Sequence, residues 1–219
     1  MPNNIEIQDI DSIRKLLENN YGDLKPFLNF NNAFQLLIAV VLSAQCTDKR
    51  VNIITERLFK IYVKPSDLAK KNLNNFEEEI KTCGMFHNKA KNIIGASKIL
   101  AEKYNDEVPE NFEILTSLPG VGRKSANVIL GTYFNENRFP VDTHVFRTAN
   151  RIGLANSKTP EKTEEELTKI IPPALWMKMH RWLIKHGRTY CTARNPKCPS
   201  CFLKNYCLYY KRDFNHKNS

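Results

Sequence analysis

The sequence has no apolar run long enough to cross a membrane. Its longest apolar stretch, residues 34–44, falls well short of the roughly 20 residues that a membrane-spanning helix needs. The first 20 residues carry acidic side chains and no apolar core segment, which is not the pattern of a secretory signal. We therefore expect a cytoplasmic location.

Alternating apolar and polar residues, the mark of half-buried strands, are almost absent, and no repeat or low-complexity segment occurs. Apolar residues recur instead at helical spacing, for example at Val51, Ile54 and Leu58. The segment 33–44 is apolar almost all round, which is typical of a central, buried helix. The sequence predicts an all-α fold.

Acidic residues are too few to balance the basic ones. The chain of 219 residues has 23 Asp and Glu against 33 Lys and Arg, which gives a net charge of +10. A basic chain of ordinary globular composition favours a polyanionic partner such as nucleic acid. The sequence is also rich in Lys, Asn and Ile, as proteins encoded by A+T-rich DNA are, so the charge alone supports that partner only modestly.

Six cysteines are present, and in a reducing compartment they are not expected to form disulfides. Four crowd together as Cys191-x6-Cys198-x2-Cys201-x5-Cys207, a density typical of metal ligands. One Cys-x2-Cys pair with wider flanking gaps favours a [4Fe–4S] cluster. Zinc is the alternative, although its sites usually have two such pairs. Arg194 and Lys197 lie between these cysteines; they could face a phosphate backbone or simply solvent.

Residues 118–126, Leu-Pro-Gly-Val-Gly-Arg-Lys-Ser-Ala, predict a tight turn followed by a helix to about residue 134. The free amides at such a helix start can hold a phosphate through backbone contacts. Lys124 falls in the first helical turn, where the helix dipole disfavours a positive charge. The core face should carry Ala126, Ile129, Leu130 and Tyr133. The plainer alternative is an ordinary helix–turn–helix corner with an exposed lysine.

These motifs together resemble the endonuclease III family of helix-hairpin-helix DNA glycosylases. The resemblance lies in residues 118–126, in Val141-Asp-Thr-His-Val-Phe-Arg147, in the cysteine loop, and in Leu42-Ser-Ala-Gln-Cys-Thr-Asp48. It covers residues 9 to 209. Several motifs in the right order make this far more specific than the hairpin alone.

The resemblance implies a two-lobed, all-α fold that binds damaged double-stranded DNA and acts as a monomer. One lobe is a six-helix barrel with the hairpin, residues 25–134. The other is discontinuous, formed by residues 1–24 and 135–219, and it includes the [4Fe–4S] loop at 191–207. Such a protein would be associated with the nucleoid of a bacterial cell.

The resemblance also implies an activity: excision of oxidised pyrimidines through a lysine Schiff base, then cleavage of the abasic site by β-elimination. Lys124 would be the nucleophile and Asp142 its catalytic partner, although Asp142 also fits a plain helix N-cap. A monofunctional adenine or mismatch glycosylase is an alternative, which Lys124 weighs against. A non-catalytic, metal-stabilised DNA-binding module is another.

The family pattern assigns the DNA contacts as well. Gln45 would fill the space left by a flipped nucleotide, and Met85 would be a second wedge where the family usually has leucine. Without the resemblance, we would interpret Gln45 as a polar residue at a helix end and Met85 as a residue that fills the core. The remaining candidates lie in the hairpin, in the motif around residue 142 and in the cysteine loop: Leu118, Gly120, Gly122, Arg123, His144, Arg194 and Lys197.

Overall fold

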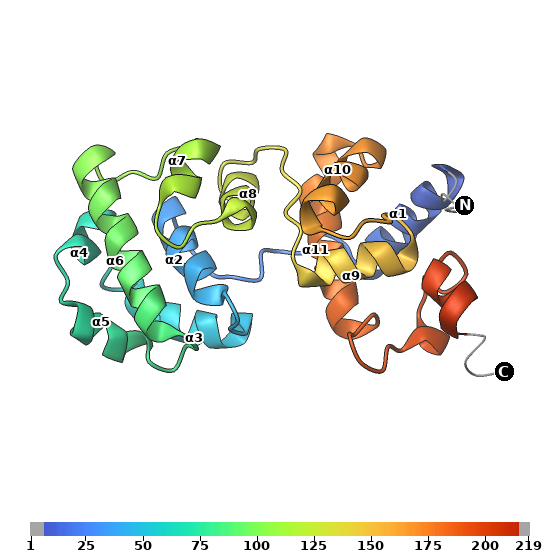
Figure 1. Cartoon of the computed structure of the whole chain (residues 1–219), viewed down its shortest axis with the longest axis horizontal. Helices are drawn as coiled ribbons and strands as arrows, with labels where there is room; N and C mark the ends of the chain where they lie inside the picture. The colour runs from blue at the N-terminus through green and yellow to red at the C-terminus, as the bar shows by residue number, and fades with distance from the viewer. Residues whose placement is uncertain (1–6, 215–219) are drawn as a thin grey trace. The chain divides into compact units, whose positions relative to one another are not determined.

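A computed structural model describes residues 7–214, and within that range every regular element is a helix (Figure 1). The described chain is therefore all-α, as the sequence predicted. The helices are α1 Ile7–Tyr21, α2 Ala33–Ser43, α3 Asp48–Leu58, α4 Pro65–Ala69, α5 Leu73–Ile80, α6 Phe86–Lys103, α7 Phe112–Ser117, α8 Arg123–Thr132, α9 Thr143–Ile152, α10 Pro160–Ile170, η1 Pro173–Leu175, α11 Trp176–Thr189, η2 Cys198–Ser200 and η3 Tyr210–Phe214.

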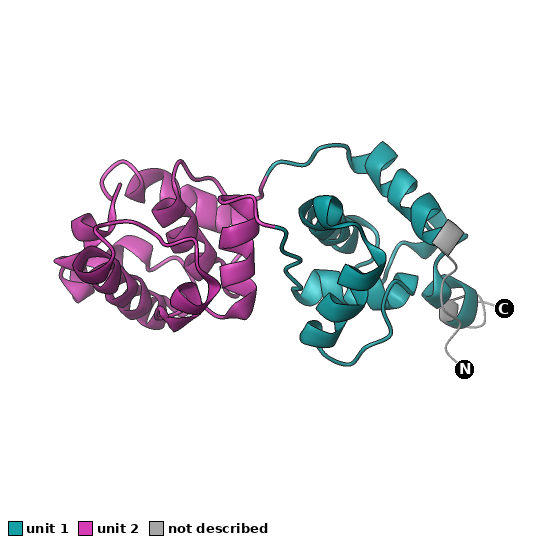
Figure 2. Cartoon of the chain, turned by 90° about the horizontal axis from the view of Figure 1, so that it is seen from above, with its two compact units in different colours: residues 1–25, 137–219 teal, residues 26–136 magenta. Residues whose placement is uncertain are grey.

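The chain folds into two compact units (Figure 2). One unit contains residues 26–136, and the other combines residues 1–25 with 137–219. The chain passes from one unit to the other twice, so the second unit is discontinuous in sequence. Each unit has its own set of buried apolar side chains.

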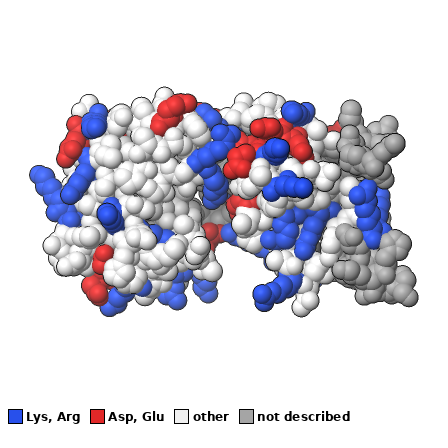
Figure 3. Space-filling view, viewed as in Figure 1, with Lys and Arg blue, Asp and Glu red and all other residues white. Residues whose placement is uncertain are grey.

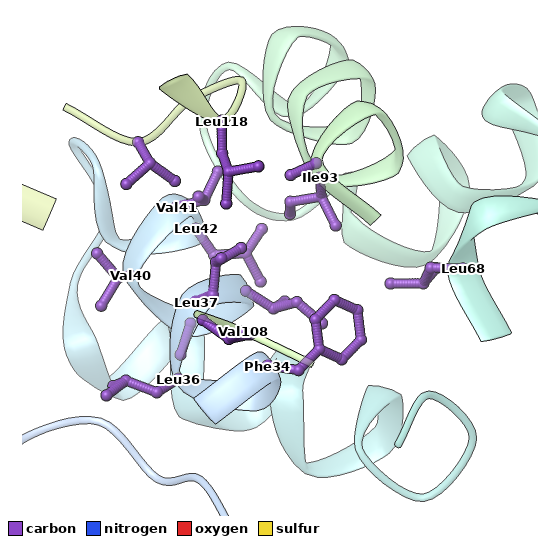
Figure 4. Packing of buried hydrophobic residues seen from close by; sticks show 14 of the residues in the cluster. Phe34, Leu36, Leu37, Val40, Val41, Leu42, Leu68, Ile93, Val108 and Leu118 are labelled. Atoms are coloured by element: carbon purple, nitrogen blue, oxygen red, sulfur yellow. The ribbon is translucent and has the colours of Figure 1, made fainter. Parts of the chain in front are cut away.

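Helix α2 forms the centre of unit 26–136, because all of its residues from Ala33 to Leu42 are buried. Helices α3, α6 and α8 pack against it, and the side chains that meet there form one apolar cluster (Figure 4). Asn32 caps the start of α2, where its side chain accepts a hydrogen bond of 2.9 Å from the Gln35 amide. No helix among residues 7–214 is long and apolar enough to span a bilayer.

In the other unit, long-range hydrogen bonds join α1 to α11. Trp182 Nε1 donates to the Gly22 carbonyl at 2.7 Å, just after α1 ends. The Tyr21 hydroxyl lies 3.0 Å from His186 Nδ1, and Trp182 and His186 are both almost fully buried. The N-terminal helix therefore completes the core that the C-terminal helices begin.

Two local expectations were wrong in detail. Helix α8 ends at Thr132, and Tyr133, expected in the core, is 38% exposed. Its ring makes edge contacts with Phe30 and Phe134 instead. The short helices α4 and α5 have clear start signals, since Pro65 begins the first and the Asn72 side chain caps the second.

Leu37→Ala should strongly destabilise unit 26–136. Leu37 lies on α2 with no exposed surface, so truncation removes buried methyl groups and leaves a cavity. The expected loss in free energy of unfolding is about 2–5 kcal/mol. Urea denaturation followed by circular dichroism measures it. Ile61→Ala is the matched control, because Ile61 is 63% exposed and should change stability little; equal effects would contradict the central position of α2.

Candidate functional site

The turn between α7 and α8 is built around Gly120. The amide of Val121 donates to the Leu118 carbonyl at 3.1 Å and closes the turn. Gly120 has φ +78°, and a Cβ there would lie 2.9 Å from Cβ of Asn92 on α6. Glycine is therefore required both by the backbone conformation and by the close approach of α6.

Only part of this hairpin is accessible. Leu118 is 2% exposed and belongs to the apolar cluster, so a contact between Leu118 and DNA would have to involve its backbone. Gly122 and Arg123 are exposed, and a Cβ at Gly122 would meet nothing within 4 Å. The open side of the turn is the side where α8 begins, as a phosphate site at a helix N-terminus needs.

Lys124 lies in the first turn of α8 and is exposed. Ala126, Ile129 and Leu130 are fully buried, so the core face of the helix is filled by apolar side chains. Gly122 caps the helix without a side-chain hydrogen bond. The positive end of the α8 dipole thus lies beside a lysine, a placement that lowers rather than raises helix stability.

Asp142 is the N-cap of α9, and its Oδ1 accepts a 2.7 Å hydrogen bond from the Val145 amide. This cap fixes the direction of the carboxylate, which is half-buried. Asp142 belongs to the discontinuous unit and Lys124 to unit 26–136. The two candidate catalytic residues therefore come from different units of the protein.

Gln45 and Met85 lie in neighbouring turns of unit 26–136. Both have left-handed backbones, with φ of 51° and 56°, and both are exposed, Met85 to 48%. A Cβ at Gly84 would lie 3.7 Å from the Gln45 carbonyl oxygen, so the two turns lie close together. A left-handed backbone costs roughly 1–2 kcal/mol for such residues, and strain of this kind concentrates at functional positions.

Basic side chains outnumber acidic ones on the face shown in Figure 3. Among the candidates in the cysteine loop, Arg194 and Lys197 are both exposed. His144 is half-buried, with its Nδ1 3.2 Å from Arg147 Nη2. Arg147 also donates to the carbonyls of Gly187 and Cys191, each at 2.9 Å, so His144 adjoins the contact that fastens α9 to the start of the cysteine loop.

The four clustered cysteines line one pocket with apolar and aromatic neighbours. Burial raises the pKa of the Cys201 and Cys207 thiols to about 11 and also raises the pKa of Cys198. Thiols in such a site would be neutral by themselves, and binding iron would stabilise them as thiolates. The donor set therefore suits a metal group.

The spacing of the four cysteines along the chain, one Cys-x2-Cys pair with wider flanking gaps, favours a four-iron cluster over a single zinc ion. The sulfurs also have polar neighbours: Arg151 Nη1 is 3.7 Å from Cys191 Sγ, and His186 Nε2 is 3.4 Å from Cys201 Sγ.

Two family models match this chain. One, described as HhH-GPD superfamily base excision DNA repair protein, matches residues 38–173, and the other, the iron-sulfur binding domain of endonuclease III, matches residues 191–207. Endonuclease III of Rickettsia conorii is 46% identical over 206 residues, which cover 94% of this chain and 98% of the relative. That of Escherichia coli K12 is 44% identical over 200 residues, covering 91% and 94%.

This chain belongs to the endonuclease III family. Solved structures agree with that assignment. A trapped endonuclease III–DNA covalent intermediate matches with a TM-score of 0.90 and 40% identity, over 95% of this chain and 99% of that one. A non-covalent endonuclease III–DNA complex gives 0.91 and 41%, over 96% and 99%. The protein is accordingly a base excision repair enzyme, a DNA glycosylase with abasic-site lyase activity, and it carries a [4Fe–4S] cluster.

Sequence reasoning missed three residues that the structure makes prominent. Arg147 and Arg151, one helical turn apart on α9, donate to carbonyls of the cysteine loop. Lys89 is a lysine with 3% exposure. A signal for Lys89 was present, because it shares a helical face with the buried Ile93 and Ala96.

Cys198→Ser should abolish the yellow-brown colour of the cluster and destabilise the discontinuous unit. A serine hydroxyl is a poor replacement for a thiolate, and metal binding is coupled to folding of the loop. Iron and sulfide content, visible absorption and thermal unfolding provide the measurements. Cys46→Ser is the matched control and should keep the cluster, because Cys46 belongs to the other unit. A coloured, fully loaded Cys198→Ser protein would show that this cysteine is not a ligand.

Proposed function

We propose that this protein excises oxidised pyrimidines from double-stranded DNA and then cleaves the abasic site, with Lys124 as nucleophile. The observation that carries the proposal is the exposed lysine in the first turn of α8, directly after the glycine turn, in a chain of the endonuclease III family. The solved relatives of that family include a covalent DNA intermediate. A lysine amine is a group that can form such a covalent bond with a sugar.

DNA would be held mainly through its backbone. The exposed turn at Gly120 and Gly122 offers helix-start amides to a phosphate, with Arg123 beside them. The turns of Gln45 and Met85 would enter the duplex and occupy the space left by the flipped nucleotide. Flipping is necessary because C1′ of a stacked nucleotide cannot be reached by the lysine.

The neutral amine of Lys124 would attack C1′ while the bond to the damaged base breaks and the base leaves with a proton. The sugar opens, and the nitrogen becomes part of a Schiff base with C1′. Loss of a proton from C2′ then breaks the bond between C3′ and the phosphate oxygen, which cleaves the strand. Water hydrolyses the Schiff base and restores the amine.

Asp142 would assist by accepting a proton or by stabilising the positive charge that develops on the sugar. Its cap hydrogen bond to Val145 holds the carboxylate in one direction, which favours such a role. The neutral form of Lys124 would be favoured by the positive end of α8, by the neighbouring Arg123 and by the exclusion of water when DNA binds.

The residues that would hold the cluster are Cys191, Cys198, Cys201 and Cys207. When bound, the cluster supplies a cross-link between these residues and a positive charge for their thiolates. Arg194 and Lys197, both exposed in the same loop, would then face DNA phosphates.

We also propose that the enzyme acts as a monomer.

Lys124→Gln should abolish the covalent adduct that borohydride traps on DNA with thymine glycol or with a preformed abasic site. DNA affinity should change little, because the turn amides rather than this side chain are proposed to hold the phosphate. The control is Lys98→Gln, an exposed lysine on α6. If the wild-type protein forms an adduct only on the abasic duplex, the base substrate is wrong; if it forms none, the function is a monofunctional glycosylase or a binding module.

Asp142→Asn should slow turnover by about 100-fold or more while the protein stays folded. Asparagine caps a helix as well as aspartate does, so this change removes the charge and keeps the cap. Asp142→Ala is the matched comparison, which should also lose about 1 kcal/mol of stability. Single-turnover kinetics and thermal unfolding measure the two effects. A normal rate in Asp142→Asn would leave Asp142 only its capping role.

A further inference from the structure

Lys89 is a buried cation with no part in the chemistry above. It lies in the first turn of α6 and is 3% exposed. Its ammonium donates to the Leu42 carbonyl at 2.8 Å and to Cys83 Sγ at 3.1 Å. Among residues 7–214 no carboxylate pairs with it, and burial raises the pKa of the Cys83 thiol, which keeps that thiol neutral. Burial of an ammonium without a counter-ion is unfavourable, so the presence of a lysine here needs a physical reason.

The acceptor of this ammonium is the end of a helix. Leu42 lies in the last turn of α2, where the carbonyls have no partner within the helix and carry the negative end of its dipole. The same carbonyl accepts a hydrogen bond from Cys83 Sγ at 3.3 Å. Gln45 follows Leu42 by three residues. It lies in a turn that the Cys46 amide closes by donating to the Ser43 carbonyl.

The backbone of Lys89 contacts the Met85 turn. The backbone amide of Lys89 donates to the Met85 carbonyl at 3.1 Å, and Met85 is the N-cap of α6. Lys89 therefore contacts both turns. Its backbone amide binds Met85, and its side chain binds Leu42, three residues before Gln45. Backbone strain of this kind persists only where the surroundings fix it.

We propose that Lys89 is a positioning residue that ties the Gln45 turn to the Met85 turn and so sets the two side chains that open the DNA stack. This inference rests on the proposed function, because it takes Gln45 and Met85 as the residues that enter the duplex. Misplacing such groups by about 1 Å can reduce a rate about 100-fold. The buried ammonium binds a carbonyl at the end of α2 that would otherwise keep only the weak donor Cys83 Sγ.

The test compares two substrates for Lys89→Met, which keeps the length of the side chain and removes its charge and donors. Base excision from a paired duplex with thymine glycol needs the stack to be opened. Schiff-base formation with an abasic site in single-stranded DNA does not, since no base pair has to be broken. The variant should lose about tenfold to 100-fold on the duplex and stay within about twofold of wild type on the single strand.

Base flipping can also be followed directly, through the fluorescence of 2-aminopurine placed opposite or beside the lesion. Lys89→Met should lose the rise in fluorescence that wild type gives on binding, and a merely structural change would not affect this signal selectively. Lys98→Met is the matched control, because Lys98 is an exposed lysine on the same helix. It should behave as wild type with both substrates and with the fluorescent duplex.

Two results would overturn the proposal: equal losses on the two substrates, or wild-type excision and flipping in Lys89→Met. If that variant does not fold, Lys89→Gln is measured instead, because it keeps one donor but is too short to reach both acceptors. The quantity compared is the ratio of the duplex rate to the single-strand rate. A ratio equal to wild type would then overturn it. Failure of the proposed function is distinguishable, because in that case the wild-type protein itself does not excise thymine glycol from the duplex or forms no adduct with either substrate.

Discussion

Burial of α2 on every side is the constraint on which unit 26–136 depends. Since α2 has no exposed face before Ser43, the helices α3, α6 and α8 have to pack around it. This places the glycine turn before α8, the start of α6 and the turn after α2 on one rigid support. Packing against α2 thus supports all three segments proposed to meet DNA, and Lys89 adds direct hydrogen bonds between two of them.

Two lysines of this unit occupy positions that weaken the fold. Lys124 lies at the positive end of α8, and Lys89 is buried without a carboxylate. The chain has 33 Lys and Arg residues, so exposed positions could hold these two lysines without that cost. Local choices that contradict stability, in a sequence otherwise consistent with its fold, are the expected signs of function. Lys124 is exposed, where a substrate can reach it, and Lys89 donates to a carbonyl at the end of α2.

The discontinuous unit is held by contacts of a different kind. Aromatic and histidine side chains join α1 to α11, and arginines of α9 bind the carbonyls of the cysteine loop. Little of that loop is regular structure, so its conformation depends on these hydrogen bonds and on the metal group. Gly187 of α11 permits the close approach, since a Cβ there would lie 2.8 Å from Thr148 Oγ1.

The sequence by itself determined what depends on neighbouring residues. The Asp142 helix cap, the central position of α2 and the cysteine spacing depend on residues close together in sequence and could be predicted. Packing decided the rest: Leu118 is buried, Tyr133 is exposed, and the turns of Gln45 and Met85 lie close together. A helical period says which residues share a face, but only the neighbours present in three dimensions decide whether that face is covered. The burial of Lys89 against the end of α2 depends on a contact between residues 47 positions apart, which no local pattern specifies.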